Sequence, residues 1–256
     1  MENFKIEKRP TLSAISGLLL SIIPTEAKAL EIPTQGNWYD GMQAFEQSAN
    51  DESNEWVAMY AMNAEGEGVW TSPLEGGPGG VENSPALFIY EAYKKIGEIT
   101  SLCDIHTHPL SNSDRLDIRS SGPSAPDIFG TVEFSTREDL YSSTLPLLDE
   151  VSPTASIVRG VATHHGIWYY EFDPTLIPAE TTEFFPNDVS NAFWNNFENL
   201  ELLFPEDATI PLSQDEAARI TEWYETILFT RVRYVPYSNI QQEPPCAGVN
   251  YTQSNN

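Results

Sequence analysis

The chain has 256 residues and is strongly acidic, with 13 Lys and Arg against 38 Asp and Glu and a formal net charge of −25. This charge repels phosphate backbones, so the composition argues against a nucleic-acid-binding protein. Apolar residues make up 40% of the chain and include six Trp. That is enough for a hydrophobic core, so the composition excludes a wholly disordered chain.

Residues 1–29 have the pattern of a cleaved secretory signal peptide. Basic residues precede an apolar run from Leu12 to Ile23, and Ala27-Lys28-Ala29 has the small-x-small pattern of a signal-peptidase site. The run is too short to cross a bilayer, and no other apolar run is longer. We therefore expect an exported protein, periplasmic or extracellular, without a membrane span. In that compartment Cys103 and Cys246 could form a disulfide, although they lie far apart in the sequence.

Predicted strands and helices alternate along the chain that follows. Residues 30–50 are polar and turn-rich, and we expect them to lead into the fold without regular structure. The segment 55–62 (EWVAMYAM) is typical of a strand, and 55–72 is predicted to form a hairpin. Ser84 and Pro85 begin a predicted helix as capping residue and first-turn proline. The predicted inward stripe of this helix is Leu87, Ile89, Tyr90, Tyr93 and Ile96.

The middle of the chain is predicted to form further strands. Residues 102–106 have the composition of a buried strand that ends at a His-Pro turn. A long loop rich in Ser, Asp and Pro follows, and then a short predicted helix at 124–130. Residues 156–163 and 167–172 are predicted strands joined through His164-His165-Gly166, which is a hairpin signal.

The last third of the chain is predicted to be mainly helical. The aromatic-rich segment 191–204 is one predicted helical region, and a second helix begins at the capping box Ser213–Glu216. Residues 231–237 alternate like a last strand, and 240–256 are expected to form a loose tail. The element order predicts an α/β protein. Its predicted organisation is a signal peptide at 1–29, a main domain at 30–175 and a helical C-terminal extension, packed on that domain, at 176–256.

Two of the four histidines, His106 and His108, lie at the end of the predicted strand 102–106. Side chains two positions apart in a strand point to the same side, so both imidazoles can reach one metal ion. A neighbouring carboxylate such as Asp104, or a backbone carbonyl, would then orient an imidazole. Such a pair also occurs as ordinary solvated or core histidines, so further ligands are needed to indicate a metal site.

Those further residues lie downstream and upstream of the histidine pair. Asp127, three positions after Ser124, completes a set of two histidines and one carboxylate. This set leaves a fourth coordination position for water, which a catalytic zinc site needs and a structural one lacks. Upstream, Glu55 at the start of the first predicted strand could accept the proton of that water.

The order Glu … His-x-His-Pro … Pro-Ser-x-x-Asp resembles the signature of the JAMM (MPN-plus) zinc metalloproteases over about residues 50–172. The resemblance implies an MPN-like core with a mixed β-sheet and flanking helices. It implies that His106, His108 and Asp127 bind zinc, that Glu55 is the general base and acid, and that Ser124 helps to hold the substrate carbonyl oxygen. The implied activity is hydrolysis of a peptide or isopeptide bond in a peptide or protein substrate.

One departure from the family pattern leaves alternatives for two of these residues. The loop between His108 and Asp127 is longer than is usual in the family, and it contains a second Ser-x-x-Asp at Ser111–Asp114. We favour Asp127 because Pro123 precedes its motif and an apolar pair follows it. Glu52 is the alternative to Glu55.

Two other functions remain as alternatives to a JAMM-type hydrolase. One is a metal-free binding module on the same fold. The other is an amidohydrolase-type metal enzyme, because Asp104-Ile-His106-Thr-His108 also matches the D-x-H-x-H start of those barrels. The sequence does not indicate an oligomeric state.

Overall fold

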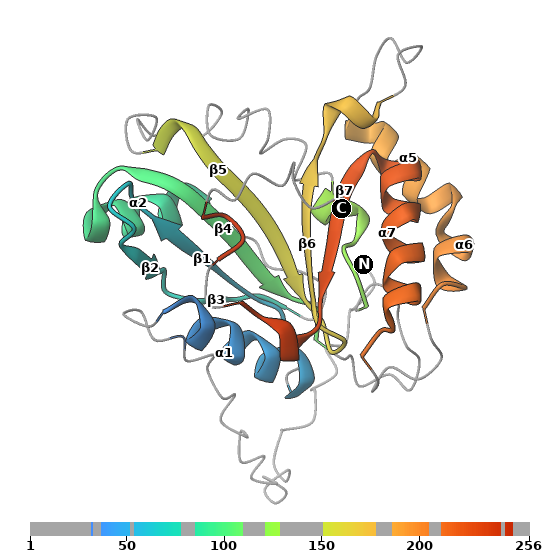
Figure 1. Ribbon diagram of the computed structural model, residues 1–256, viewed down its shortest axis with the longest axis horizontal. Coiled ribbons are helices and arrows are strands. Elements are labelled where there is room, and N and C mark those ends of the chain that lie inside the picture. The colour runs from blue at the N-terminus through green and yellow to red at the C-terminus, as the bar shows by residue number, and fades with distance from the viewer. Residues whose placement is uncertain are drawn as a thin grey trace, which may run out of the picture.

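The computed structural model describes residues 32, 37–51, 54–77, 85–109, 121–128, 151–177, 186–204, 211–241 and 244–247. The predicted signal peptide, Glu52 and the Ser111–Asp114 motif lie outside these residues. Within them, strands and helices combine into an α/β fold with one mixed sheet (Figure 1). The predicted α/β class is therefore confirmed at this level.

The sheet has the order β2-β1-β4-β5-β6-β7, and β3 also pairs with β1. The pair β4–β5 is parallel and the other neighbours are antiparallel. The strands are β1 (Trp56–Met62), β2 (Gly68–Trp70), β3 (Leu74–Glu75), β4 (Ile99–Thr107), β5 (Val151–Ala162), β6 (Ile167–Phe172) and β7 (Thr230–Val235). The predicted hairpin through His164 and His165 is confirmed, because Ala162 of β5 pairs with Ile167 of β6.

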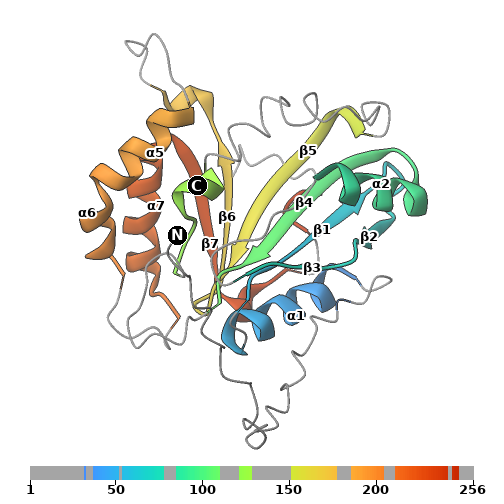
Figure 2. The ribbon, with the colours of Figure 1, turned by 180° about the vertical axis from the view of Figure 1, so that it is seen from behind.

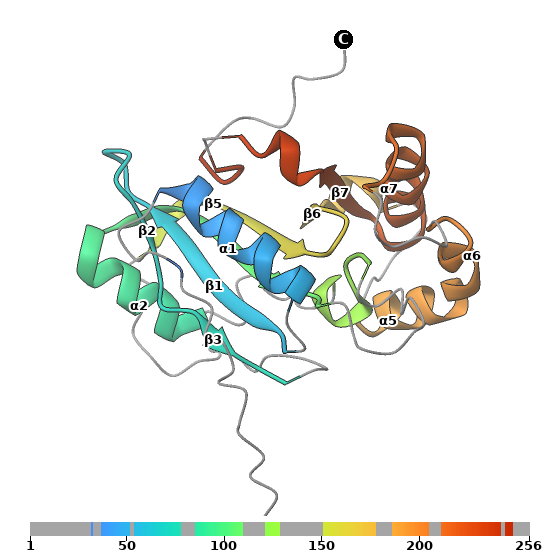
Figure 3. The same cartoon turned by 90° about the horizontal axis from the view of Figure 1, so that it is seen from below.

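The helices gather in separate groups around this sheet. Figure 1 shows α5, α6 and α7 beside β6 and β7, and Figure 3 shows α1 and α2 on opposite sides of β1. The helices are α1 (Trp38–Asp51), α2 (Pro85–Ile96), α5 (Pro186–Asn195), α6 (Phe197–Glu201) and α7 (Gln214–Leu228), with 3₁₀ turns at Pro174–Leu176 and Tyr237–Asn239.

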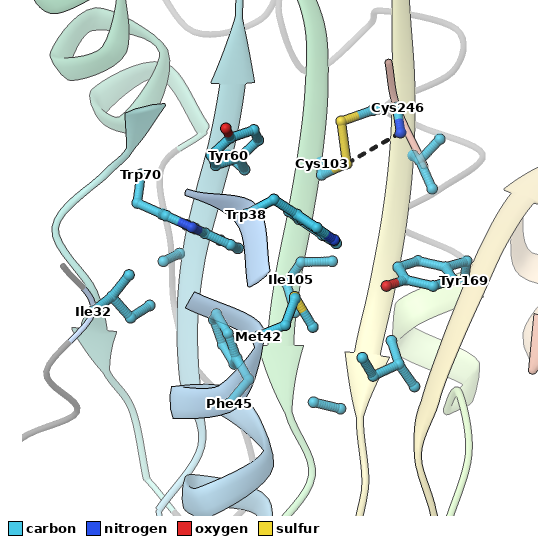
Figure 4. Packing of buried hydrophobic residues seen from close by; sticks show 14 of the residues in the cluster. Ile32, Trp38, Met42, Phe45, Tyr60, Trp70, Cys103, Ile105, Tyr169 and Cys246 are labelled. Carbon is cyan, nitrogen blue, oxygen red and sulfur yellow. Dashed lines mark hydrogen bonds between the residues drawn. A yellow bond between two sulfur atoms is a disulfide. The ribbon is translucent and has the colours of Figure 1, made fainter. Parts of the chain in front are cut away.

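The helix α1 corrects the expectation that residues 30–50 lack regular structure. Trp38, Met42 and Phe45 recur at helical spacing and are almost fully buried on β1 and its neighbours (Figure 4). The indole of Trp38 stacks on that of Trp70 with ring centroids 5.3 Å apart. The polar residues Asp40, Gln43, Gln47 and Asn50 of the same helix are exposed, which is why the segment resembles a polar loop when its composition alone is considered.

The helix α2 is where predicted, but it is rotated relative to the predicted stripe. Phe88, Ile89 and Ala92 are buried against β1 and β4, whereas Leu87 is 65% exposed. Tyr90 and Tyr93 are also exposed. Of the predicted stripe, Ile89 is buried and Ile96 partly buried, so the remainder of the stripe was wrong.

The C-terminal segment contributes to the sheet as well as to the helical layer. The predicted capping box is confirmed, since Ser213 Oγ accepts from Glu216 N and Glu216 Oε2 accepts from Ser213 N. The strand β7 pairs with β6 along its whole length. Apolar side chains of α5, α6 and α7 share one core cluster with β5, β6 and β7.

Cys246 forms a disulfide with Cys103 of β4, with the two Cα atoms 5.6 Å apart (Figure 4). The backbone N–H of Cys246 also donates to Cys103 Sγ. The expected loose tail is therefore attached to the centre of the sheet at this residue. None of the helices in the described ranges is both long and apolar enough to cross a bilayer.

Candidate metal centre

The end of β4 and the helical turn at residues 125–128 bring three potential ligands together. The Nε2 atoms of His106 and His108 are 3.2 Å apart. Asp127 Oδ1 lies 3.1 Å from Nε2 of His106, and Oδ2 lies 3.4 Å from Nε2 of His108. One ligand atom from each residue lies within 4.8 Å of the others, so this group could hold a metal ion.

The ring of His108 is oriented by the backbone of residue 122. Its Nδ1 lies 3.1 Å from the carbonyl oxygen of Gly122. Because a carbonyl can only accept, Nδ1 carries the proton and Nε2 keeps its lone pair for a metal. Of the two orienting groups considered from the sequence, a backbone carbonyl serves His108. Gly122 itself has no sequence signal that would have revealed this contact.

The carboxylate of Asp127 is held by the first residue of its own motif. The backbone N–H and the hydroxyl of Ser124 both donate to Oδ2, at 2.7 and 2.6 Å. Ser-x-x-Asp therefore acts as a local clamp at the start of the helical turn, similar to one half of a capping box. The predicted role of Ser124 as a donor to a substrate oxygen stays a prediction, because here its hydroxyl donates to Asp127.

The charges of the site are strongly coupled. Burial raises the pKa of Asp127, but the neighbouring His106 and His108 and the hydrogen bonds from His106 and Ser124 lower it far more, so the pKa lies well below its usual value. Burial lowers the pKa of His106, and the carboxylate of Asp127 outweighs that effect and raises it overall. The carboxylate is therefore ionised at neutral pH and available as a ligand.

Glu55 lies at the same end of the sheet, immediately before β1. The β1–β4 register pairs Val57 with His106, and Trp56 N–H donates to Thr107 Oγ1 at 2.8 Å. Burial raises the pKa of Glu55 to about 7; the charge of His106 opposes this rise and that of Asp127 adds to it. Glu55 is thus close enough to the histidine–aspartate group to interact with it electrostatically, as a general base beside a metal would need.

Asp104 belongs to an ion pair next to the site instead of orienting a ligand by a hydrogen bond. Its Oδ2 lies 3.1 Å from Nε of Arg159, its parallel-strand neighbour on β5. Asp104 is 4% exposed, and its Oδ1 has no hydrogen-bond partner among the residues that the structure describes. This pair lies on the same face of the sheet as His106, one pleat away, and no sequence pattern indicated it.

The described strands do not have the architecture that one alternative implies. They form a mixed sheet with β2 and β7 at its two edges, which differs from the parallel barrel of the amidohydrolase-type enzymes. His164 and His165 form the turn between β5 and β6. Burial and the neighbouring His165 lower the pKa of His164 to about 3, so His164 stays neutral.

No protein-family model, curated protein or solved structure matches this chain. The chemistry of the site is therefore inferred from its own geometry. Two imidazoles and one carboxylate, with one histidine oriented by a carbonyl and the carboxylate held by a serine, form a donor set that could hold a divalent metal ion.

Proposed function

We propose that this chain is a zinc-dependent hydrolase of peptide or isopeptide bonds with a JAMM-type site. The observation that carries the proposal is the convergence of His106, His108 and Asp127 within 4.8 Å, with Glu55 beside them. These residues come from separate segments of the chain, in the same order as in the family signature. We further propose that the α/β core is MPN-like and that the protein is exported.

The proposed chemistry assigns one role to each side chain. A zinc ion held by His106, His108 and Asp127 would supply Lewis acidity and would lower the pKa of a water in the open fourth position to roughly 7. Glu55 would be the group that accepts a proton from the attacking water and returns it to the leaving amine. Its pKa of about 7 suits both steps, since it can gain and lose a proton near neutral pH.

Ser124 has a supporting role in the same scheme. Its hydroxyl and backbone N–H hold Oδ2 of Asp127, which leaves Oδ1 directed at His106 and the site. A donor to the developing oxyanion is typically worth about 10²-fold or more in rate. We propose that the Ser124 hydroxyl can donate to a substrate carbonyl only when binding of a metal ion by Asp127 frees this hydroxyl from its hydrogen bond to Oδ2.

The alternative function is a binding module without catalysis. The presence of all three ligands and of a raised-pKa carboxylate favours the enzyme, because a binding module needs neither. Zinc content of the purified full chain separates the two. We expect about one zinc per chain in the wild type, and a folded wild type without bound metal would favour the binding module. Metal analysis should include iron, since two histidines and a carboxylate also bind Fe²⁺.

Hydrolysis is tested with peptide and isopeptide libraries and the variant Glu55→Gln. We expect the wild type to cleave and Glu55→Gln to lose cleavage while retaining zinc. The matched control is Glu222→Gln, which makes the same chemical change at an exposed position of α7. Unchanged turnover by Glu55→Gln would remove Glu55 from the mechanism.

A further inference from the structure

Three consecutive backbone carbonyls beside the metal centre each interact with a different buried side chain. The oxygen of Ser121 accepts from Trp168 Nε1 at 2.9 Å. The oxygen of Gly122 accepts from His108 Nδ1 at 3.1 Å, and that of Pro123 accepts from Tyr224 OH at 2.6 Å. These three hydrogen bonds connect the segment to three other parts of the fold.

The donors come from three different elements of the fold. His108 follows β4, Trp168 is on β6, and Tyr224 is on α7, 101 residues after the carbonyl to which it donates. Trp168 and Tyr224 are almost fully buried. Figure 2 shows the light-green turn that includes residues 125–128 in front of the sheet beside β7 and α7.

The packing around Gly122 shows how closely Tyr224 approaches this segment. A Cβ atom added at Gly122 would lie 3.1 Å from the Tyr224 hydroxyl and 3.2 Å from Cζ of Phe204. Both contacts are tighter than ordinary van der Waals distances, so the segment lies directly against the C-terminal helical layer. A side chain at residue 122 would push the segment away from that layer.

The same segment leads directly into the carboxylate ligand. Ser124 follows Pro123 and holds Asp127 through two hydrogen bonds. Ala125 and Ile128 of the same turn are buried in the core cluster that also contains Tyr224 and Trp168. The position of the turn, and with it that of Asp127, therefore depends on side chains of α7 and β6.

We propose that Tyr224 is a positioning residue of the metal centre, acting through the Pro123 carbonyl on both His108 and Asp127. Trp168 holds the other end of the segment in the same way. This inference rests on the metal-binding part of the proposed function and is independent of whether the site hydrolyses peptides. The C-terminal segment is then a required part of the metal-binding unit, in addition to its place in the core.

The test compares Tyr224→Phe with Tyr237→Phe in the full chain. Each variant removes one tyrosine hydroxyl that donates to a backbone carbonyl, since the partly buried Tyr237 donates through its OH to Thr163 O at 2.7 Å. Tyr237, however, packs with the cluster on the α1 side of the sheet. Both variants should therefore lose a similar amount of thermal stability in the presence of a chelator.

Metal binding should separate the two variants. Loss of a partner that orients a metal ligand typically weakens metal binding by about 10- to 100-fold. We expect Tyr224→Phe to weaken zinc binding by about 10-fold in competition with a chromophoric chelator, and Tyr237→Phe to stay within about 2-fold. The visible absorption of bound Co²⁺ should change in Tyr224→Phe alone, because this spectrum reports ligand geometry.

Several outcomes would overturn the inference. One is a Tyr224→Phe variant that binds zinc as Tyr237→Phe does and has an unchanged Co²⁺ spectrum. Should Tyr224→Phe fail to fold, Gly122→Ala decides, because its added methyl group would press against Tyr224 and Phe204 and disturb the same contact between the segment and the C-terminal helical layer; unaltered zinc affinity there would also overturn it. A folded wild type that binds neither zinc nor Co²⁺ refutes the proposed metal site itself, and this inference with it.

Discussion

The two faces of β4 serve different purposes although their residues alternate along one strand. Cys103, Ile105 and Thr107 lie on the face covered by α1, where they form the disulfide, fill the core and accept a hydrogen bond from Trp56. Asp104 and His106 lie on the opposite face, where they meet Arg159 and Asp127. The pleat of a strand makes this separation possible, because adjacent side chains point in opposite directions.

Because the two faces are separate, the sheet has a polar site on one side and an apolar core on the other. On the α1 side, burial of apolar surface and the disulfide stabilise the fold. On the metal side, buried charges need partners, and within the described part of the chain Asp104 Oδ1 lacks a hydrogen bond. Such groups cost free energy unless they are paired, and they are typical of sites kept for chemistry. Substitutions on the two faces should therefore change different measurements.

The largest effect on stability is expected from the disulfide. Cys246→Ala removes the bond but leaves the sulfur of Cys103 in the core. We expect the free energy of unfolding in urea to fall by about 2–5 kcal/mol, because the bond closes a long loop in the unfolded chain. Zinc affinity should change little, since the disulfide lies on the face opposite the ligands. A large loss of zinc affinity would show that the two faces are coupled.

For His106→Ala, on the opposite face of β4, we expect the stabilisation by zinc to be lost. Zinc at 100 times its dissociation constant should stabilise the wild type by about 2.7 kcal/mol, and this increment should vanish in the variant. Unfolding is measured with zinc and with a chelator. His164→Ala is the matched control, since it removes an imidazole from the hairpin turn and leaves the ligands intact. A zinc increment that survives in His106→Ala would contradict the ligand assignment.

Ile105→Val tests the separation of the two faces of β4 at the position next to His106. Ile105 is fully buried in the cluster under α1. Loss of one methylene there should cost about 0.5–1.5 kcal/mol of unfolding free energy and leave zinc affinity unchanged. An altered zinc affinity together with a small stability loss would mean that the strand transmits packing changes across its faces.

The smallest effect is expected from the titration of Glu55 in the metal-free protein. Its pKa is about 7 in the folded chain against an ordinary 4.5, so the folded state binds this proton more tightly. Stability from Glu55 is therefore fully present below about pH 4.5 and is lost as the pH rises through about 7. Because Glu55 is partly exposed, solvent screening reduces the effect.

The measurement is the difference in unfolding free energy between wild type and Glu55→Gln in chelator, as a function of pH. The wild type should lose stability relative to the variant as the pH rises from 5 to 8 (roughly the range between the two pKa values). A difference that does not vary with pH would indicate that burial does not raise the pKa of this carboxyl group.

Local patterns predicted most of the strands and the start of α7. The segment 55–62, the hairpin around His164 and the capping box at Ser213 were all correctly placed, because alternation, turn residues and caps act over a few neighbouring residues. The helix α1 was missed because its apolar stripe is narrow and surrounded by polar residues. The rotation of α2 was wrong because two aromatic residues face solvent.

The features of the candidate site also divide into those that local patterns predicted and those that depend on contacts between distant segments. The placement of His106 and His108 on one side of a strand follows from spacing alone, since strand geometry is local. The hydrogen bonds from Ser124 to Asp127 were not predicted, although they too are local, because the sequence analysis assigned Ser124 to a substrate oxygen. The contact between His108 and Gly122, the ion pair of Asp104 and the bond from Tyr224 join distant segments. No local pattern encodes such pairings.

Residue types and their spacing by themselves predicted the α/β class and singled out His106, His108 and Asp127, which the structure brings together. Only the tertiary structure decided that the cysteines meet, that α1 covers one face of the sheet, and that α7 supports the segment next to Asp127. The physical reason is that donor type and side-chain direction depend on the local backbone. Proximity across 100 residues depends on how the whole core packs.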